Sequence, residues 1–157
     1  MHGRQAVRTV DTDMPTSVSV SRGFLDVRTR GTGFVDITRS VRNWLKEIGA
    51  CEGVVTLFVR HTSASLTVQE NADPDVQADL LDSLRKLAPE NDFYRHTIEG
   101  PDDMPAHIKS MLTQVSLSVP VTERALVLGT WQALYLIEHR SRPHDRTISL
   151  MFIGLHG

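Results

Sequence analysis

The chain has 157 residues, of which 40% are hydrophobic and 23% charged, and its formal net charge is -2. This is the composition of an ordinary globular domain, and it excludes a disordered chain or a repeat array. Without a basic excess, the chain lacks the charge that general nucleic-acid binding requires. The single cysteine, Cys51, excludes an intrachain disulfide and any Cys₄ or Cys₂His₂ zinc site.

No apolar run reaches membrane-spanning length, and residues 1–15 contain no apolar signal core. We therefore expect a cytoplasmic protein that binds neither membranes nor nucleic acid. Residues 1–15 are predicted to form a flexible N-terminal arm. Residues 16–157 are predicted to form a single domain, because no linker or low-complexity tract divides them.

The first predicted elements are strands. Residues 16–20 alternate Val18 and Val20 with serines, which is typical of a half-exposed strand. Residues 23–37 carry turn residues between short β-prone pieces.

Residues 38–48 are predicted to form a helix with one apolar face. Thr38 is the expected N-cap, and Gly49 is expected to end the helix in the left-handed conformation. The residues at helical spacing on the apolar face are Val41, Trp44, Leu45 and Ile48.

Residues 53–60 are nearly all apolar and often β-branched, which predicts a central strand covered on both faces. Residues 64–68 predict a further strand. A second helix is predicted to end at Leu87, with Asp73 as its N-cap and Pro74 at its first position.

A third, shorter helix is predicted to begin near Pro105, with Ile108, Met111 and Leu112 as its apolar face. Strands and helices do not alternate regularly along the chain. We therefore predict an α+β fold with an antiparallel or mixed, sandwich-like sheet core and about three flanking helices. The last strands are predicted at residues 115–119, 125–128, 133–137 and 147–153.

His61 is the first candidate site residue. It follows directly on the predicted central strand, which could hold its imidazole rigidly beside a cleft. A core histidine with one backbone partner explains the same position about equally well. Ser63 and Ser65 could suggest a Ser–His nucleophile pair, but side chains so close on an extended segment rarely reach hydrogen-bond geometry.

Polar residues before the second helix form another candidate group. Glu70 and Asn71 are not needed to cap that helix, so they are candidates for a site near its positive end. Gln132 and Trp131 follow Gly129 between two predicted strands. The indole of Trp131 could form the wall of a ligand pocket, or it could belong to the core.

The densest polar cluster lies at residues 94–107, and it combines histidines with carboxylates. Such side chains can ligate a divalent metal ion, but their spacing matches no compact metal motif. A solvated acidic loop, with Asp103 capping the next helix, explains these residues slightly better on their own. The titratable residues of the cluster are His96, Glu99, Asp102, Asp103 and His107.

A charged turn is predicted at residues 138–146. Its arginines, Arg140, Arg142 and Arg146, could grip a phosphate group through bidentate hydrogen bonds. More often, such a turn is simply exposed to solvent.

Several motifs in order along the chain closely resemble the YjbQ family, which is also labelled secondary thiamine-phosphate synthase. The resemblance runs from about Ser21 to the C-terminus and leaves the N-terminal arm outside. The motifs are His61-Thr-Ser-Ala-Ser-Leu-Thr, Glu70-Asn-Ala-Asp-Pro-Asp-Val, Glu99-Gly-Pro-Asp-Asp-Met-Pro-Ala-His-Ile-Lys-Ser, Gly129-Thr-Trp-Gln and Glu138-His-Arg.

The resemblance implies a β-sandwich-like core, a homotrimer, and a site formed by the histidine-bearing segments between subunits. It favours a metal site over a solvated loop at residues 94–107, with zinc, magnesium or manganese as the expected ion. It also carries over Arg146 from the charged turn, but not His144. The implied roles are catalytic for His61, Glu70, Asn71 and Asp102, ligand-binding for Trp131, Gln132 and Arg146, and metal-binding for His96, His107 and His61, which could instead be the acid or base.

The family label implies weak thiamine-phosphate synthase activity. This reaction joins hydroxymethylpyrimidine diphosphate to thiazole phosphate and releases pyrophosphate. Two alternatives remain open: a trimeric protein that only binds a metal or a small phosphate, and a metal-dependent hydrolase of a phosphorylated metabolite.

Overall fold

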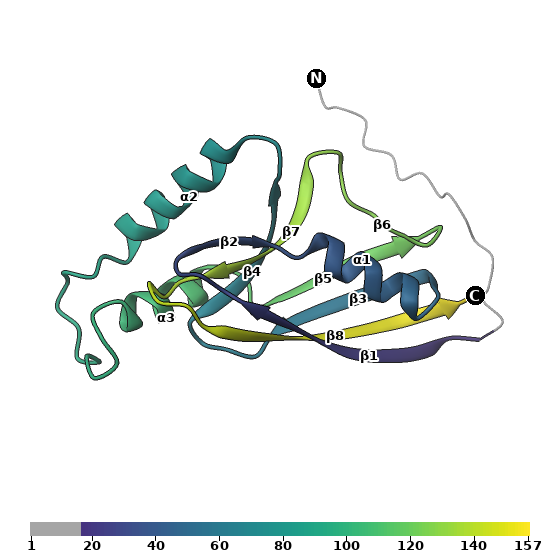
Figure 1. Ribbon diagram of the computed structural model, residues 1–157, viewed down its shortest axis with the longest axis horizontal. Coiled ribbons are helices and arrows are strands. Elements are labelled where there is room, and N and C mark those ends of the chain that lie inside the picture. The colour runs from purple at the N-terminus through teal and green to yellow at the C-terminus, as the bar shows by residue number, and fades with distance from the viewer. Residues whose placement is uncertain (1–16) are drawn as a thin grey trace, which may run out of the picture.

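The computed structural model describes residues 17–157, which form eight strands and three helices (Figure 1). The predicted N-terminal arm and Thr16 lie outside this range. In chain order the elements are β1 (Ser19–Arg28), β2 (Gly33–Asp36), α1 (Thr38–Glu47), β3 (Ala50–Val59), β4 (Ala64–Glu70), α2 (Pro74–Leu87), α3 (Asp103–Leu112), β5 (Ser116–Thr122), β6 (Ala125–Leu126), β7 (Gln132–Glu138) and β8 (Asp145–His156).

The strands form two antiparallel sheets. Sheet A has the order β1-β8-β3-β5-β6, and sheet B has the order β2-β7-β4. Sheet B and α1 lie on the same side of sheet A (Figure 1). The predicted α+β class, with an antiparallel sandwich-like core and three helices, is confirmed. None of the described helices combines the length and apolarity needed to cross a membrane.

The core lies between the two sheets and beneath α1. Every second residue of β3, β5 and β8 faces inward, as the pleat of a strand requires. Sheet B and the buried face of α1 close this layer from the other side. The most deeply buried members are Val41, Val55, Leu57, Val59, Leu66, Leu134, Leu136, Ile148 and Phe152.

β3 is a central strand, but it is not covered on both faces as predicted. Val54 is 42% exposed and Phe58 is 49% exposed, because sheet B and α1 cover only the inner face of sheet A. The side chains opposite the core therefore leave an apolar surface uncovered within one chain. We call it the outer apolar face, and it comprises Val20, Phe24, Val54, Phe58, Met151 and Ile153.

β1 continues to Arg28, well beyond the predicted strand at residues 16–20. It passes through Gly23, where a Cβ atom would lie 2.7 Å from Nε1 of Trp44. The glycine therefore does not end the strand but admits the indole of α1.

The start of α1 differs from the prediction. Thr38 is the first helical residue and not the N-cap, because Ile37 occupies the cap position. The Thr38 hydroxyl instead accepts a hydrogen bond from the Leu134 amide at 2.9 Å, which ties α1 to β7. The end is as predicted, since Gly49 has a φ of 67°.

The predicted cap of α2 is confirmed, because the Asp73 carboxylate accepts from the Asp75 amide at 2.9 Å. The predicted buried face of α3 is wrong. Met111 is 80% exposed and Leu112 is 54% exposed, while small and polar residues face the protein. The Ser110 hydroxyl, for example, donates to the Ala64 carbonyl at 3.1 Å, which places this side of α3 against β4.

Candidate metal and ligand site

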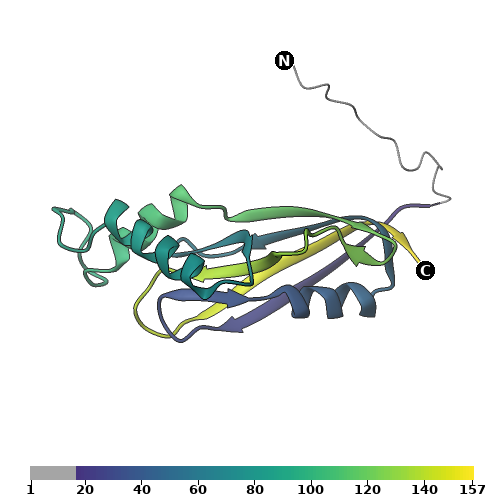
Figure 2. The ribbon, with the colours of Figure 1, turned by 90° about the horizontal axis from the view of Figure 1, so that it is seen from above.

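The histidine-bearing segments converge at one end of the molecule. β3 ends there, β4 begins there, and α3 packs across β4. The loop that joins β7 in sheet B to β8 in sheet A turns at the same end. α2 and α3 lie at this end and α1 at the other, as Figure 2 shows from above. We call the two ends the histidine end and the α1 end.

Four side chains gather at the start of α3. Each of His96, Glu99, Asp103 and His107 offers one ligand atom, and these atoms all lie within 4.8 Å of one another. Oδ2 of Asp103 lies 2.7 Å from Nε2 of His96 and 3.2 Å from Nε2 of His107. Two imidazoles and two carboxylates form a donor set that suits a divalent transition metal. We call these four residues the His–Asp cluster.

His107 shows how the proton is placed on one of these rings. Its Nδ1 lies 3.1 Å from the carbonyl oxygen of Thr62. A carbonyl can only accept, so Nδ1 must carry the hydrogen. If the ring is neutral, Nε2 then presents a lone pair toward the Asp103 carboxylate, and two acceptors face each other. A cation, either a second proton or a metal ion, is needed between them.

Arg140 holds the carboxylates of this region in place. Its guanidinium donates to Oδ2 of Asp102 at 3.1 Å, to Oδ1 of Asp103, and to the Glu99 carbonyl at 2.8 Å. Asp103 therefore has one oxygen for Arg140 and the other for the histidines. Burial alone would raise the pKa of Asp103, but the bonds with His96 and Glu99 and the charge of Arg140 lower it.

Asp102 faces away from the His–Asp cluster. Its carboxylate accepts from the Ser141 amide at 2.8 Å, the Ser141 hydroxyl at 2.9 Å and Arg140. Burial would raise the pKa of Asp102, but these bonds lower it to about 2. Asp102 thus holds the start of α3 against the loop that joins β7 to β8. The interpretation of Asp103 as a simple helix cap is wrong, because its carboxylate serves His96, His107 and Arg140.

His61 borders a cavity beside this cluster. The cavity has a volume of about 590 Å³ and reaches from the end of β3 to α3. Its walls are mostly apolar, and His61 and His107 supply imidazoles to it, with Arg60 at its edge. The apolar lining consists of Phe58, Val59, Met111 and Val115.

The protonation of His61 is fixed by the backbone. The Thr147 amide donates to Nε2 of His61 at 2.8 Å, so this nitrogen must be unprotonated. Burial, followed by the charge of Arg146, lowers the pKa of His61 and keeps the ring neutral. The ring is then a donor through Nδ1. Nε2 of His61 is occupied, and His61 is not among the four clustered residues. The geometry therefore does not place His61 as a third metal ligand.

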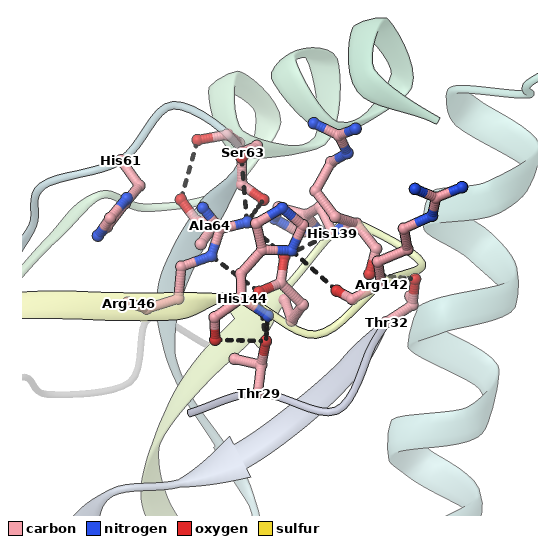
Figure 3. Close-up of polar contacts among 12 residues, drawn as sticks. Thr29, Thr32, His61, Ser63, Ala64, His139, Arg142, His144 and Arg146 are labelled. Atoms are coloured by element: carbon pink, nitrogen blue, oxygen red, sulfur yellow. Dashed lines mark hydrogen bonds and ion pairs between the residues drawn. The ribbon is translucent and has the colours of Figure 1, made fainter. Parts of the chain in front are cut away.

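A buried polar network supports the loop that follows His61. Glu138 and Arg146 form an ion pair with Nε–Oε2 and Nη2–Oε1 distances of 2.8 and 2.5 Å, and both side chains are almost fully buried. Arg146 also donates to the Ser63 hydroxyl at 3.0 Å, and the Thr29 hydroxyl donates to Glu138 at 2.8 Å. Figure 3 shows His61 at the edge of this network, beside Arg146. Arg146, predicted to bind ligand, thus has an interior ion-pair partner.

The remaining predicted residues lie at the far end of sheet B. β4 and β7 pair Ala64 with Glu138 at the histidine end and Glu70 with Gln132 at the other. Six residue steps at about 3.3 Å each separate these pairs by roughly 20 Å. Asn71 and Trp131 lie at the same far end, where the Asn71 amide donates to the Trp131 carbonyl at 2.9 Å. One chain therefore does not bring these four residues to its own histidines.

Trp131 is not a core residue, because it is 63% exposed. Gln132 closes its turn by accepting from the Gly129 amide at 2.8 Å. Asn71 and Trp131 are thus presented on the surface, where they can contact a ligand or another chain, while Glu70 is half-buried beside them.

The role of Arg140 was missed from the sequence, and Asp102 was chosen over Asp103. One signal was available: Asp103 and His107 are four residues apart, so a helix that includes both must place them on one face. No comparable signal pointed to Arg140, whose neighbours come from a segment almost forty residues away.

Comparisons with known proteins agree over nearly all of the described chain. The family described as "UPF0047 protein YjbQ-like" matches residues 24–155. UPF0047 protein sll1880 of Synechocystis sp. is 47% identical over 131 residues, which cover 83% of this chain and 89% of that protein. UPF0047 protein YjbQ of Salmonella typhimurium is 46% identical over 117 residues, which cover 74% and 85%.

Solved structures show the same similarity. An uncharacterized conserved protein of the YjbQ/UPF0047 family from Clostridium acetobutylicum has a TM-score of 0.77 at 36% identity, and the match covers 82% of this chain and 98% of that one. The conserved hypothetical protein TT1486 from Thermus thermophilus has a TM-score of 0.73 at 41% identity, covering 82% and 97%.

Proposed function

The chain belongs to the YjbQ-like UPF0047 family, and from this premise we propose that it binds a divalent metal ion at the His–Asp cluster and acts on a small phosphorylated metabolite in the adjoining cavity. The cavity borders His107, a member of the cluster, so the ion and the ligand would share one site. His96, Glu99, Asp103 and His107 would hold the ion.

The observation that carries the proposal is the tautomer of His107. A metal-ligating histidine commonly donates its other ring N–H to a backbone carbonyl, as His107 does to Thr62. The lone pair of Nε2 then faces Asp103, whose other oxygen is held by Arg140. An ion between these groups satisfies acceptors that otherwise oppose each other. The two imidazoles favour zinc, whereas manganese and magnesium prefer oxygen ligands such as the two carboxylates.

The activity we propose is that of a weak thiamine-phosphate synthase, a transferase that releases pyrophosphate. A bound metal ion would stabilise the negative charge that develops on the departing phosphate. His61 offers its Nδ1–H to a ligand in the cavity, since Nε2 is held by Thr147. The apolar walls exclude water, which strengthens each of these polar contacts.

The alternatives differ in the product that they predict. A hydrolase would yield free phosphate from a phosphorylated metabolite, whereas the transferase forms a carbon–nitrogen bond and yields pyrophosphate. A protein that only binds would retain the ligand without turnover. The only lone pair of the neutral His61 ring lies on Nε2, which already accepts from the Thr147 amide, so His61 is placed as a donor and not as a base that activates water, which supports the transferase.

The proposal is tested first by elemental analysis of the purified protein and of His107→Ala and Asp103→Asn. We expect close to one zinc or manganese ion per chain in the parent and a loss of most of it in both variants. His156→Ala is the matched control, because His156 lies at the α1 end and bonds Ser19 and Ser21. Full metal content in both cluster variants would contradict the assignment.

We also propose that the chain forms a homotrimer through the outer apolar face. Exposed apolar patches with a charged rim are typical of association surfaces. Here Arg22 and Asp26 lie at the rim, while Thr56 and Ser118 are the uncharged polar residues near its centre. Phe58 belongs to this face and also lines the cavity, so a second copy seated there would form part of the cavity wall.

Association also accounts for the distant group of site residues. Glu70, Asn71, Trp131 and Gln132 lie roughly 20 Å from the histidine end of their own sheet. A neighbouring copy can present these residues to the histidines, which one chain alone does not do. The complete site would then lie between subunits.

A further inference from the structure

A second cavity lies at the α1 end, between α1 and the β5–β6 hairpin. Its volume is about 450 Å³. Its floor is apolar and buried, formed by Leu45, Ala50 and Leu126. The cavity is far from the His–Asp cluster, because β3 runs from Ala50 at one end to Val59 at the other, about 30 Å along the strand.

Basic side chains surround this floor. Arg42 and Lys46 come from α1, and Arg124 comes from the hairpin, while no carboxylate is among the lining residues. Within the described part of the chain, none of the three takes part in an ion pair. The nearby Glu52 makes no ion pair with these three side chains in the described part of the chain, and its carboxylate instead accepts from the Thr122 hydroxyl and the Glu123 amide.

The hairpin holds Arg124 in an unfavourable backbone conformation. Glu123 has a φ of 49° and Arg124 has a φ of 64°, a region that usually takes glycine or asparagine in such turns. The turn is fixed on both sides, since Glu52 binds the Glu123 amide and the Arg124 amide donates to the Cys51 carbonyl. Strain of this kind persists where the position of a side chain matters.

We propose that this cavity is a second ligand site, which binds a small phosphorylated molecule independently of the metal site. A guanidinium matches a phosphate group with two parallel hydrogen bonds, and Lys46 adds a point charge. One amino group of Arg124 donates to the main-chain oxygen of Gly157 at 2.8 Å, which orients the guanidinium, and its other donors have no partner among residues 17–157. The apolar floor receives the uncharged part of the ligand.

The test is a titration of metal-free protein with pyrophosphate in low salt, followed by amide NMR. Metal-free protein is used so that the His–Asp cluster cannot hold the anion through an ion. We expect saturable shifts at the amides of Gly49, Ala50 and Leu126. Arg124→Gln should raise the dissociation constant about tenfold, which corresponds to the loss of one charge-assisted contact.

Two further variants keep the result interpretable. Lys46→Gln removes an exposed side chain without a hydrogen bond of its own among the described contacts, so it should weaken binding even if Arg124→Gln does not fold. Arg30→Gln is the matched control, an exposed arginine at the histidine end. Equal affinity in all variants, or shifts confined to amides near His61 and Ser110, would overturn the second site and leave the proposed metal site untouched.

Discussion

At the scale of single residues, the histidines of this chain divide into different chemical roles by their neighbours. His61 has its Nε2 bonded to a backbone amide, and His107 has its Nδ1 bonded to a carbonyl. The first ring is therefore a neutral donor, and the second turns toward Asp103 the nitrogen that we propose binds the metal ion. The sequence alone identified both residues, but it did not distinguish their roles, because each role depends on one backbone group from a distant segment.

His139 has a third role, as a buried histidine that must be neutral. Its Nε2 lies 2.8 Å from the Ser65 hydroxyl, and among the described residues Nδ1 has no partner. Burial, together with the charge of Lys109, lowers the pKa of His139 from 6.5 to about 4. In the unfolded chain His139 takes up a proton at a higher pH than in the folded one, so the folded state loses stability as the pH falls from 6.5 to about 4.

We therefore expect His139→Gln to change the dependence of stability on pH. The pKa shift corresponds to about 3 kcal/mol, which the parent loses through this residue as the pH falls from 6.5 to about 4. The free energy of unfolding of His139→Gln should lack this part of the decline. Urea unfolding of both proteins at several pH values measures the difference. Parallel curves for the two proteins would show that His139 is protonated as readily in the folded as in the unfolded state.

The preference for Asp102 over Asp103 shows the limit of residue patterns. Both carboxylates begin the same helix, and both were visible as members of the polar cluster. Only the direction of α3 against β4 decides that Asp103 faces the histidines while Asp102 faces Ser141. That direction depends on which side of α3 is buried. The apolar residues Met111 and Leu112 suggested the wrong side.

At the scale of elements, the strands of sheet A were easier to predict than their environment. The apolar run of β3 predicted a central strand correctly, since β8 and β5 flank it. It also predicted cover on both faces, which is wrong within one chain because Val54 and Phe58 are exposed. The apolar residues of a strand reflect every contact that covers its two faces, whether its own chain or another copy makes that contact.

The close pairing of β3 with β8 near the α1 end depends on two glycines. A Cβ atom on Gly154 would lie 2.1 Å from the Glu52 carbonyl oxygen, and one on Gly53 would lie 2.3 Å from the Ile153 carbonyl oxygen. The pairing register also shifts between Ala50 and Glu52. The backbones therefore approach too closely at this point for any side chain.

We expect Gly154→Ala to destabilise the protein by about 2 to 3 kcal/mol, because the backbones must separate to admit the methyl group. Chemical denaturation measures the change. Ser149→Ala, on the same strand, is the control and should differ by less than about 0.5 kcal/mol. A neutral Gly154→Ala would mean that the two strands can move apart at no cost.

At the scale of the whole molecule, the two ends of sheet B carry the two halves of the site that we propose. The histidine end has the cavity and the His–Asp cluster, whereas the opposite end presents Glu70 and Trp131. The outer apolar face and the cavity share Phe58, so association and ligand binding use adjoining surfaces. The resemblance implied one site for both groups of residues, and the strand register shows that a single chain separates them.

Val54→Glu tests this arrangement, because a carboxylate on the outer apolar face would be buried without a partner in the trimer, and Val54 does not line the cavity. We expect the variant to have the mass of a monomer in solution, whereas Phe93→Glu, which changes a 95% exposed residue elsewhere, should remain a trimer. The four residues of the His–Asp cluster belong to one chain, so the monomer should keep its metal ion. It should nevertheless lose pyrophosphate release, because Glu70 and Trp131 of a neighbouring copy are no longer present. A monomeric variant with full turnover would mean that the histidine end suffices alone, and loss of the metal on dissociation would mean that the cluster itself is shared between chains.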